Sequence, residues 1–259
     1  MKDNENNNTG NAQDELAAIC RDLRIGRAAV EEALATGNPA SREFLLGVLR
    51  NVRDSRSTGR QVAMTRKARF PYMENIKKFK KDGVEFDEGL SLDDCLSLEF
   101  LKKKENIVMV GKSGTGKTML AICIGMKACE NNVQAAYFRV PELARSLGRK
   151  SDLRKYGSLL ARIDGAGLLI LDEFAYTPMT IEESQDIFNI VAGAARKKPI
   201  IVTTIRSFSE WKKMIPDEKL AQAFVSRCLD NSHLVNFTGE DHRLINMMEK
   251  QKGGSHVGH

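Results

Sequence analysis

Eight consecutive residues, 111–118, combine small and charged side chains in a pattern typical of phosphate binding. They read Gly-Lys-Ser-Gly-Thr-Gly-Lys-Thr, which completes the pattern G-x-x-x-x-G-K-[ST]. Glycine adopts backbone conformations that a Cβ atom would forbid, so such a loop can wrap around an anion with its N–H groups pointing inward. The predicted phosphate contacts are Gly111, Lys112, Ser113, Gly114, Thr115, Gly116, Lys117 and Thr118.

The surroundings of this loop support the same interpretation. An apolar run at 107–110 precedes it, and a helical stretch begins at about residue 117. This strand–loop–helix context distinguishes a nucleotide-binding loop from an ordinary glycine-rich turn. We expect Lys117 to reach the β- and γ-phosphates and the Thr118 hydroxyl to ligate Mg²⁺. The residues therefore predict that the chain binds a nucleoside triphosphate with magnesium.

Two carboxylates follow a second apolar strand. Residues 168–171 are all apolar and lead directly into Asp172 and Glu173. Because ligands of parallel sheets bind at the carboxyl ends of strands, we expect both acids to face the phosphate loop. Asp172 would then hold Mg²⁺ opposite Thr118, and Glu173 would act as the general base that polarises the attacking water. The alternative is an Asp-Glu pair that only begins a loop.

Three further residues are candidates for contacts with the γ-phosphate. Thr204 ends an apolar strand at 200–204, where it would contact the γ-phosphate or the water, or would be an ordinary β-branched strand residue. Arg227 lies on a predicted helix, either at the surface or as a finger that reaches the nucleotide of a neighbouring subunit. Arg243 follows a polar turn and is a candidate sensor within its own subunit.

The elements that must position these residues alternate between strand and helix. We expect strands at 107–110, 133–138, 167–171, 199–204 and 233–237, and helices at about 117–130, 141–149, 153–163, 181–197 and 218–229. Such alternation predicts an α/β fold with a parallel sheet flanked by helices on both faces. Upstream, apolar residues at helical spacing predict a small all-helical N-terminal module, with Ser41 as a helix N-cap.

These patterns divide the chain into five predicted parts. Residues 1–12 form an Asn-rich disordered leader and residues 13–65 a helical partner-binding module. A basic linker over 66–91 joins this module to a nucleotide-hydrolysing α/β domain over 92–248, and residues 249–259 form a flexible tail.

The composition is that of an ordinary soluble protein. The 259 residues are 42% hydrophobic and 29% charged. No apolar run approaches the roughly 20 residues that a membrane span needs, and the polar N-terminus has no secretory pattern. The five cysteines are scattered without a C-x-x-C pair, so we expect reduced thiols in a cytoplasmic protein. The four histidines suggest no metal site beyond Mg²⁺.

Positive charge is concentrated in two stretches of the chain. The net charge is +6, residues 50–81 contain eleven Lys and Arg residues, and a Lys-Lys-Lys run occupies 102–104. This distribution favours a polyanionic partner such as DNA. A solvated surface is the alternative, and the role of residues 50–81 stays open.

Several longer stretches resemble a known family. They are Arg-Lys-Ala-Arg-Phe-Pro at 66–71, Leu-Asp-Glu-Phe-Ala-Tyr-Thr-Pro at 171–178, Ser-Phe-Ser-Glu-Trp at 207–211, Ser-Arg-Cys-Leu at 226–229 and Gly-Glu-Asp-His-Arg-Leu at 239–244. Over about residues 14–247 the chain resembles the IstB-type transposition helper ATPases, a branch of the AAA+ superfamily that also contains the DnaC-type helicase loaders. The resemblance implies an AAA+ P-loop fold, ATP and Mg²⁺ as cofactors, and a nucleotide-dependent homo-oligomer. It also implies binding of duplex DNA and a partner transposase that the helical module contacts.

Some positions depart from the family pattern. Ile205 stands where the family usually has Asn, Ala175 stands where it usually has Gly, and Asp241-His242 replaces Ser-Tyr. Because the missing Asn orients water, the departure implies slow hydrolysis or reliance on Thr204. A replicative helicase loader acting in DNA replication is the main alternative function. A metabolic kinase is a third, although nothing in the sequence resembles an acceptor site.

Overall fold

The computed structural model describes residues 15–36, 38–195, 197–245 and 247. The predicted leader and the tail at 249–259 lie outside the described residues. The chain divides into two compact units, Met1–Ala63 and Met64–His259.

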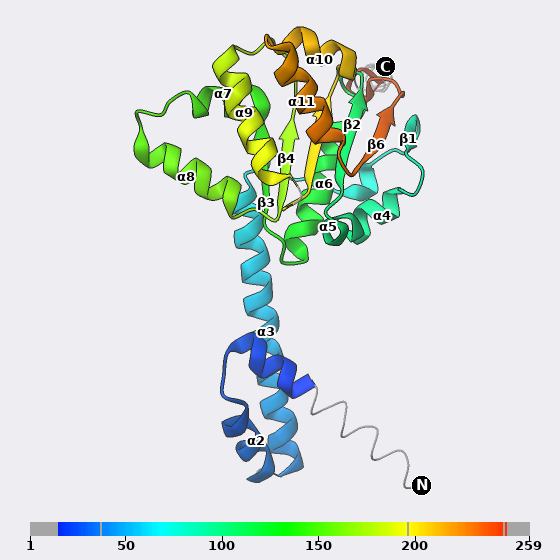
Figure 1. Ribbon diagram of the computed structural model, residues 1–259. Coiled ribbons are helices and arrows are strands. Elements are labelled where there is room, and N and C mark those ends of the chain that lie inside the picture. Colours follow the sequence, from blue (N-terminus) through cyan, green and yellow to red (C-terminus); the bar gives the residue numbers. More distant parts are fainter. Residues whose placement is uncertain (1–14, 37, 196, 246, 248–259) are drawn as a thin grey trace, which may run out of the picture. The chain divides into compact units, whose positions relative to one another are not determined.

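The described part of the first unit is helical. A segment over 15–23 is followed by α2 (Arg27–Thr36) and by the beginning of α3 (Pro39–Ala68) (Figure 1). The Asn38 side chain accepts a hydrogen bond from the Ser41 N–H at 2.8 Å. Asn38 therefore caps α3, with proline at the first helical position, where its missing N–H has no cost. The prediction that Ser41 is the N-cap was wrong, because Ser41 lies inside the first turn.

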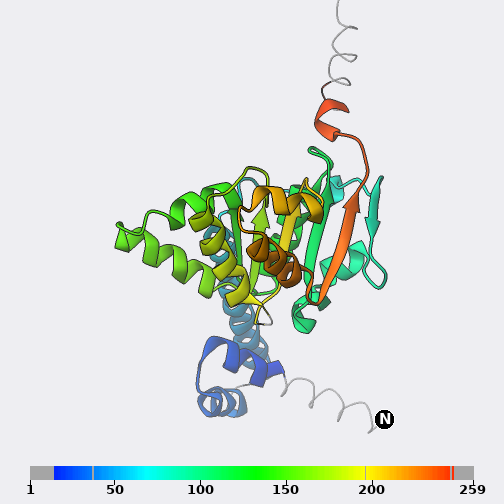
Figure 2. The same cartoon turned by 45° about the horizontal axis from the view of Figure 1, so that its top comes forward.

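The second unit contains a six-stranded sheet in the order β1-β6-β2-β5-β4-β3. The strands are β1 (Val84–Phe86), β2 (Asn106–Gly111), β3 (Ala135–Arg139), β4 (Leu168–Asp172), β5 (Ile200–Thr204) and β6 (Ser232–Phe237). All neighbours run parallel except β1, which is antiparallel to β6. Figure 2 shows β6, in orange, beside β1 at one edge of the sheet. The predicted α/β fold with a mainly parallel sheet is confirmed.

Helices fill the connections between the strands. They are α4 (Leu92–Ser97), α5 (Glu99–Lys103), α6 (Lys117–Glu130), α7 (Val140–Leu147), α8 (Leu153–Asp164), α9 (Ile181–Ala194), α10 (Phe208–Met214) and α11 (Glu218–Leu229). The bounds of α6 and α11 are those predicted from the sequence. No helix among the described residues is long and apolar enough to cross a membrane.

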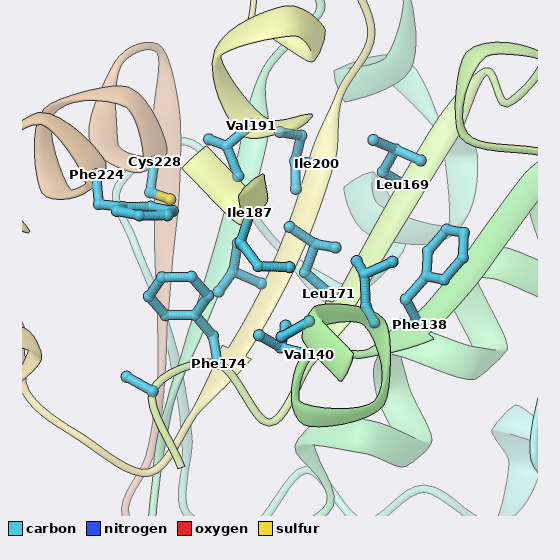
Figure 3. Close-up of a cluster of buried hydrophobic side chains, with 14 of the residues drawn as sticks. Phe138, Val140, Leu169, Leu171, Phe174, Ile187, Val191, Ile200, Phe224 and Cys228 are labelled. Carbon is cyan, nitrogen blue, oxygen red and sulfur yellow. The ribbon is translucent and has the colours of Figure 1, made fainter. Parts of the chain in front are cut away.

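The two faces of the sheet are covered by different helices. Successive strand side chains point to opposite faces, so every apolar strand supplies both cores. Leu169 and Leu171 of β4 pack with Ile187 of α9 and Phe224 of α11, as Figure 3 shows. Leu168 and Ile170 of the same strand belong to the other cluster, which contains the buried face of α6. The strands β2 to β5 are thus buried on both sides, and only their ends are left to build a site.

Residues 66–91 contain regular structure where the sequence suggested a basic linker. They include the end of α3, the short 3₁₀-helix η1 (Ile76–Lys78) and β1. Val84 of β1 lies opposite Phe237 of β6 in the sheet. A strand of three residues is too short to show an alternating pattern, which is why the sequence did not reveal it.

Candidate nucleotide-binding site

A cavity of about 560 Å³ opens where several parallel strands end. Its lining includes Tyr137 and Arg139 of β3, Asp172 of β4 and Thr203 of β5, together with the glycine loop that follows β2. The strands β2, β5 and β4 are neighbours and run parallel. The loop that follows β2 and the acids at the end of β4 therefore lie together at the carboxyl ends of the strands. The sheet therefore assembles the two halves of the site that the sequence separates.

The glycine loop requires glycine at its turning points. Gly111, Gly114 and Gly116 have φ values of 153°, 77° and 102°. A Cβ atom at Gly111 would lie 2.2 Å from the backbone oxygen of Phe237, so no larger residue fits at that position. Helix α6 begins at Lys117 without a side-chain cap, which leaves its first N–H groups available to an anion.

Lys117 is the buried cation of the site. Its side chain is only 7% exposed, and Nζ donates to the carbonyl oxygens of Gly111 at 2.6 Å and Lys112 at 2.5 Å. Burial lowers the pKa of Lys117 to about 8, although the Asp172 charge acts in the opposite direction. A desolvated ammonium group that contacts two neutral carbonyls is suited to a polyanion, so these residues fit a triphosphate.

Three hydroxyl groups donate hydrogen bonds to the carboxylate of Asp172. Asp172 is 2% exposed, and Oδ1 accepts from Thr118 Oγ1 at 2.9 Å and from Thr203 Oγ1. Its Oδ2 accepts from the Tyr137 hydroxyl at 2.5 Å. Burial, assisted by the Asp172 charge, raises the pKa of Tyr137 far above its usual range, so that hydroxyl remains a donor. A carboxylate beside a threonine hydroxyl is an oxygen-ligand set suited to Mg²⁺.

Glu173, the predicted base, is held in an ion pair. Its Oε2 accepts from Arg139 Nη2 at 2.7 Å and from Arg139 Nε at 3.2 Å. Arg139 also donates to Glu142 Oε1 at 2.8 Å. Glu173 has a left-handed φ of 59°, and its N–H donates to Thr203 Oγ1 at 3.1 Å. In this arrangement Arg139 is hydrogen-bonded to the carboxylate that would orient a water molecule.

The remaining predicted residues lie in different environments. Thr204 lines the cavity, but its hydroxyl already accepts from the Arg206 N–H at 3.1 Å and from Trp211 Nε1 at 3.3 Å. Arg243 lines the cavity and donates to Ser113 Oγ at 2.7 Å. Arg227 is exposed on α11 and does not line it.

The C-terminal part of the described chain also contacts the loop. The His242 N–H donates to the Gly114 carbonyl at 3.1 Å, beside the contact of Arg243 with Ser113. The carboxylate of Asp241 accepts from the Arg243 N–H at 2.9 Å and lies against Gly114. Three consecutive residues near the end of the chain thus hold the phosphate loop.

Sequence reasoning missed Tyr137 and Arg139. Both lie in the last three positions of β3, and both line the cavity. The available signal was that a predicted strand ends in the residues Tyr-Phe-Arg. In the sequence, this strand comes after the glycine loop and before the two acids. A parallel sheet directs such strand ends to the ligand edge.

These features define a P-loop protein with an α/β fold. The fold is similar to that of DnaI, with a TM-score of 0.50 and 19% identity over 57% of this chain and 81% of that chain. It is also similar to domain III of the Thermotoga maritima replication initiation protein DnaA, with a TM-score of 0.50 and 15% identity over 73% of this chain and 78% of that one. Identities this low show a shared fold alone.

The chain belongs to the IstB-like ATP binding protein family, which matches residues 25–250. It is 30% identical over 216 residues to the insertion sequence IS21 putative ATP-binding protein of Pseudomonas aeruginosa, which covers 82% of this chain and 79% of that protein. It is also 30% identical over 227 residues to the insertion sequence IS5376 putative ATP-binding protein of Geobacillus stearothermophilus. That match covers 86% of this chain and 90% of that protein. The family resemblance read from the sequence is confirmed.

Proposed function

We propose that this protein is an ATPase that assembles on duplex DNA and activates a partner transposase in insertion-sequence transposition. The supporting observation is the buried group of Lys117, Thr118 and Asp172 beside the glycine loop. This group occurs in a chain whose relatives are named as insertion-sequence ATP-binding proteins. The predicted helical module at 13–65 is proposed to contact the transposase, and the basic residues of the chain to contact DNA.

In this proposal each residue of the site has a separate task. Lys117 and the loop N–H groups bind the β- and γ-phosphates of ATP, and Thr118 and Asp172 hold Mg²⁺, which neutralises charge on the reacting phosphoryl group. The hydroxyls of Tyr137 and Thr203 fix the orientation of the Asp172 carboxylate.

Hydrolysis requires a change at Glu173. The carboxylate must leave Arg139 before it can take a proton from the attacking water. Ile205 brings no polar group to the cavity, and the Thr204 hydroxyl is bound by Trp211. We therefore propose slow turnover by the isolated subunit.

The proposed assembly supplies what a single subunit lacks. Arg227 is exposed on α11, outside its own cavity, so it is available to the nucleotide of a neighbouring subunit. Arg243, which contacts Ser113, is proposed to sense the nucleotide within its own subunit. We place this assembly in the cytoplasm, where the five buried free cysteines stay reduced.

Gel shifts of duplex DNA with ATP, ADP and no nucleotide test the proposal. We expect stable complexes with ATP only, and electron microscopy with a non-hydrolysable analogue should show oligomers on the DNA. A mixture of Arg227→Ala and Glu173→Gln subunits should recover turnover if the arginine acts in trans. Equal DNA binding in all three nucleotide states would contradict the proposal.

A helicase loader is the second candidate, because the superfamily branch that the sequence resembles also contains the DnaC-type helicase loaders. The two functions differ in the partner that the helical segment binds. Pull-down of a candidate transposase, compared with a replicative helicase, separates them. Capture of the helicase alone would favour the loader.

A further inference from the structure

A second cavity, of about 830 Å³, lies beside the nucleotide cavity. It is formed by the end of β3, by α7 and α8 and by the loop between these helices, which extend beyond the β3 edge of the sheet in Figure 2. The volume is in the range of ligand pockets, roughly 300–1,000 Å³. Six basic side chains line it: Arg69, Arg139, Arg149, Arg154, Lys155 and Arg162.

The acidic side chains of this cavity do not balance the basic ones. Only Glu142 and Asp152 line it, so the lining carries a net charge of about +4. Glu142 is paired with Arg139 at 2.8 Å, and Asp152 with Lys155 at 3.0 Å. Within the part of the chain that the structure describes, the other four cations of the cavity have no acidic partner.

Arg162 is the lining cation with an incompletely bonded guanidinium. Its Nη2 donates to the Tyr137 carbonyl at 2.7 Å, and its guanidinium carbon lies 3.8 Å from the centre of the Phe138 ring. Among the described residues, its buried Nε has no hydrogen-bond partner. Burial, with a smaller effect from Arg69, lowers the pKa of Arg162 to about 10. This guanidinium is desolvated, repelled by another cation and incompletely bonded.

We propose that this cavity binds phosphate groups, at a site separate from the glycine loop. Arginine is suited to this ligand because its planar fork donates two parallel hydrogen bonds to phosphate oxygens. The lining therefore combines Arg162, whose buried Nε has no partner among the described residues, with Arg149 and Arg154, which are exposed to solvent. The phosphate belongs either to a nucleic acid strand or to a free polyphosphate. If it belongs to DNA, the inference rests on the proposed function and names where the strand is bound.

The test compares two double variants of the full chain that remove equal charge. Arg149→Ala/Arg154→Ala changes two exposed cavity residues, and Lys212→Ala/Lys213→Ala changes two exposed residues of α10 outside both cavities. Each protein is first saturated with a non-hydrolysable ATP analogue and magnesium, so that the glycine loop is filled. Three probes follow: a labelled single-stranded oligonucleotide, the labelled duplex, and tripolyphosphate by calorimetry in magnesium excess.

We expect the arginine variant to weaken at least one probe about tenfold, and the lysine variant to change affinity by less than about twofold. Analogue affinity and melting temperature should be unchanged in both variants. For an oligonucleotide that responds, the plot of log affinity against log salt should become less steep, with the magnitude of its slope reduced by about 2.

The probe that responds identifies the source of the phosphate. Equal losses in the two double variants, or no loss with any probe, would overturn the inference. If the wild-type chain binds neither oligonucleotide, DNA binding in the proposed function fails. The tripolyphosphate titration then tests independently whether the second cavity binds phosphate.

Discussion

The two cavities adjoin at Arg139, yet they are built in different ways. In the nucleotide cavity the charged groups Lys117 and Asp172 are buried, and their polar atoms are bonded to fixed partners. In the second cavity five of the six cations are exposed side chains, and three of these five, Arg149, Arg154 and Lys155, belong to α8 and the loop before it. Burial makes the first site depend on geometry and resist salt, whereas exposed charges are screened within about 10 Å at 0.1 M salt. The comparison separates recognition by fixed geometry from recognition by charge.

The largest expected effect comes from Lys117→Ala. Loss of the buried cation should weaken ATP binding by about 100-fold or more, because charged hydrogen bonds to phosphate are lost inside the protein. Calorimetry with Mg-ATP measures this loss. The exposed Lys127→Ala, on the same helix but outside the cavity, is the matched control and should change affinity by less than about threefold. If Lys117→Ala also abolished tripolyphosphate binding in the second cavity, the two cavities would not be separate phosphate sites.

Glu173→Gln should reduce ATP turnover by about 100-fold while nucleotide binding is retained, because an amide cannot accept the proton of the attacking water. Steady-state phosphate release under DNA-bound conditions measures the change. Glu142→Gln makes the same substitution on the other partner of Arg139 and should leave turnover within about threefold. Unchanged turnover in Glu173→Gln would remove this residue from the catalytic assignment.

Raising the pH should distinguish the two cavities. Binding of phosphate favours protonated Lys117, whose pKa is lowered to about 8, so ATP affinity should fall roughly tenfold between about pH 7.5 and pH 9. Arg162, with a pKa of about 10, keeps its charge over this interval. Tripolyphosphate binding to the analogue-saturated protein should therefore stay nearly constant. A parallel decline at both sites would show that Lys117 does not cause the effect.

Arg139→Ala should have the smallest effect and the opposite sign. It frees the Glu173 carboxylate, so basal ATP turnover should rise about threefold to tenfold. Measurement of turnover without DNA tests this change, with Arg145→Ala on the exposed face of α7 as a control. A fall in turnover would mean that Arg139 positions the base and does not restrain it.

The sequence predicted those parts of the site that consist of local patterns. The glycine loop occupies eight adjacent residues, and Asp172 with Glu173 directly follows an apolar strand. The contact between Thr118 and Asp172 followed from the rule that parallel strands end at one edge. Local pattern and topology together therefore predicted the phosphate and magnesium groups.

The rest depends on contacts between distant residues. Tyr137 reaches Asp172, and Arg139 reaches Glu173, only because β3 lies next to β4. The order of strands in the sheet, on which these contacts depend, was not predicted from the sequence. Similarly, Asn38 and Ser41 are both good capping residues, and only the backbone geometry decides between them.

The attachment of residues 241–243 to the glycine loop has a practical consequence. His242 and Arg243 bond to Gly114 and Ser113, so a triphosphate entering the loop acts directly on the far end of the chain. A fluorophore coupled a few residues beyond this contact would report nucleotide loading in real time, without labelled ATP.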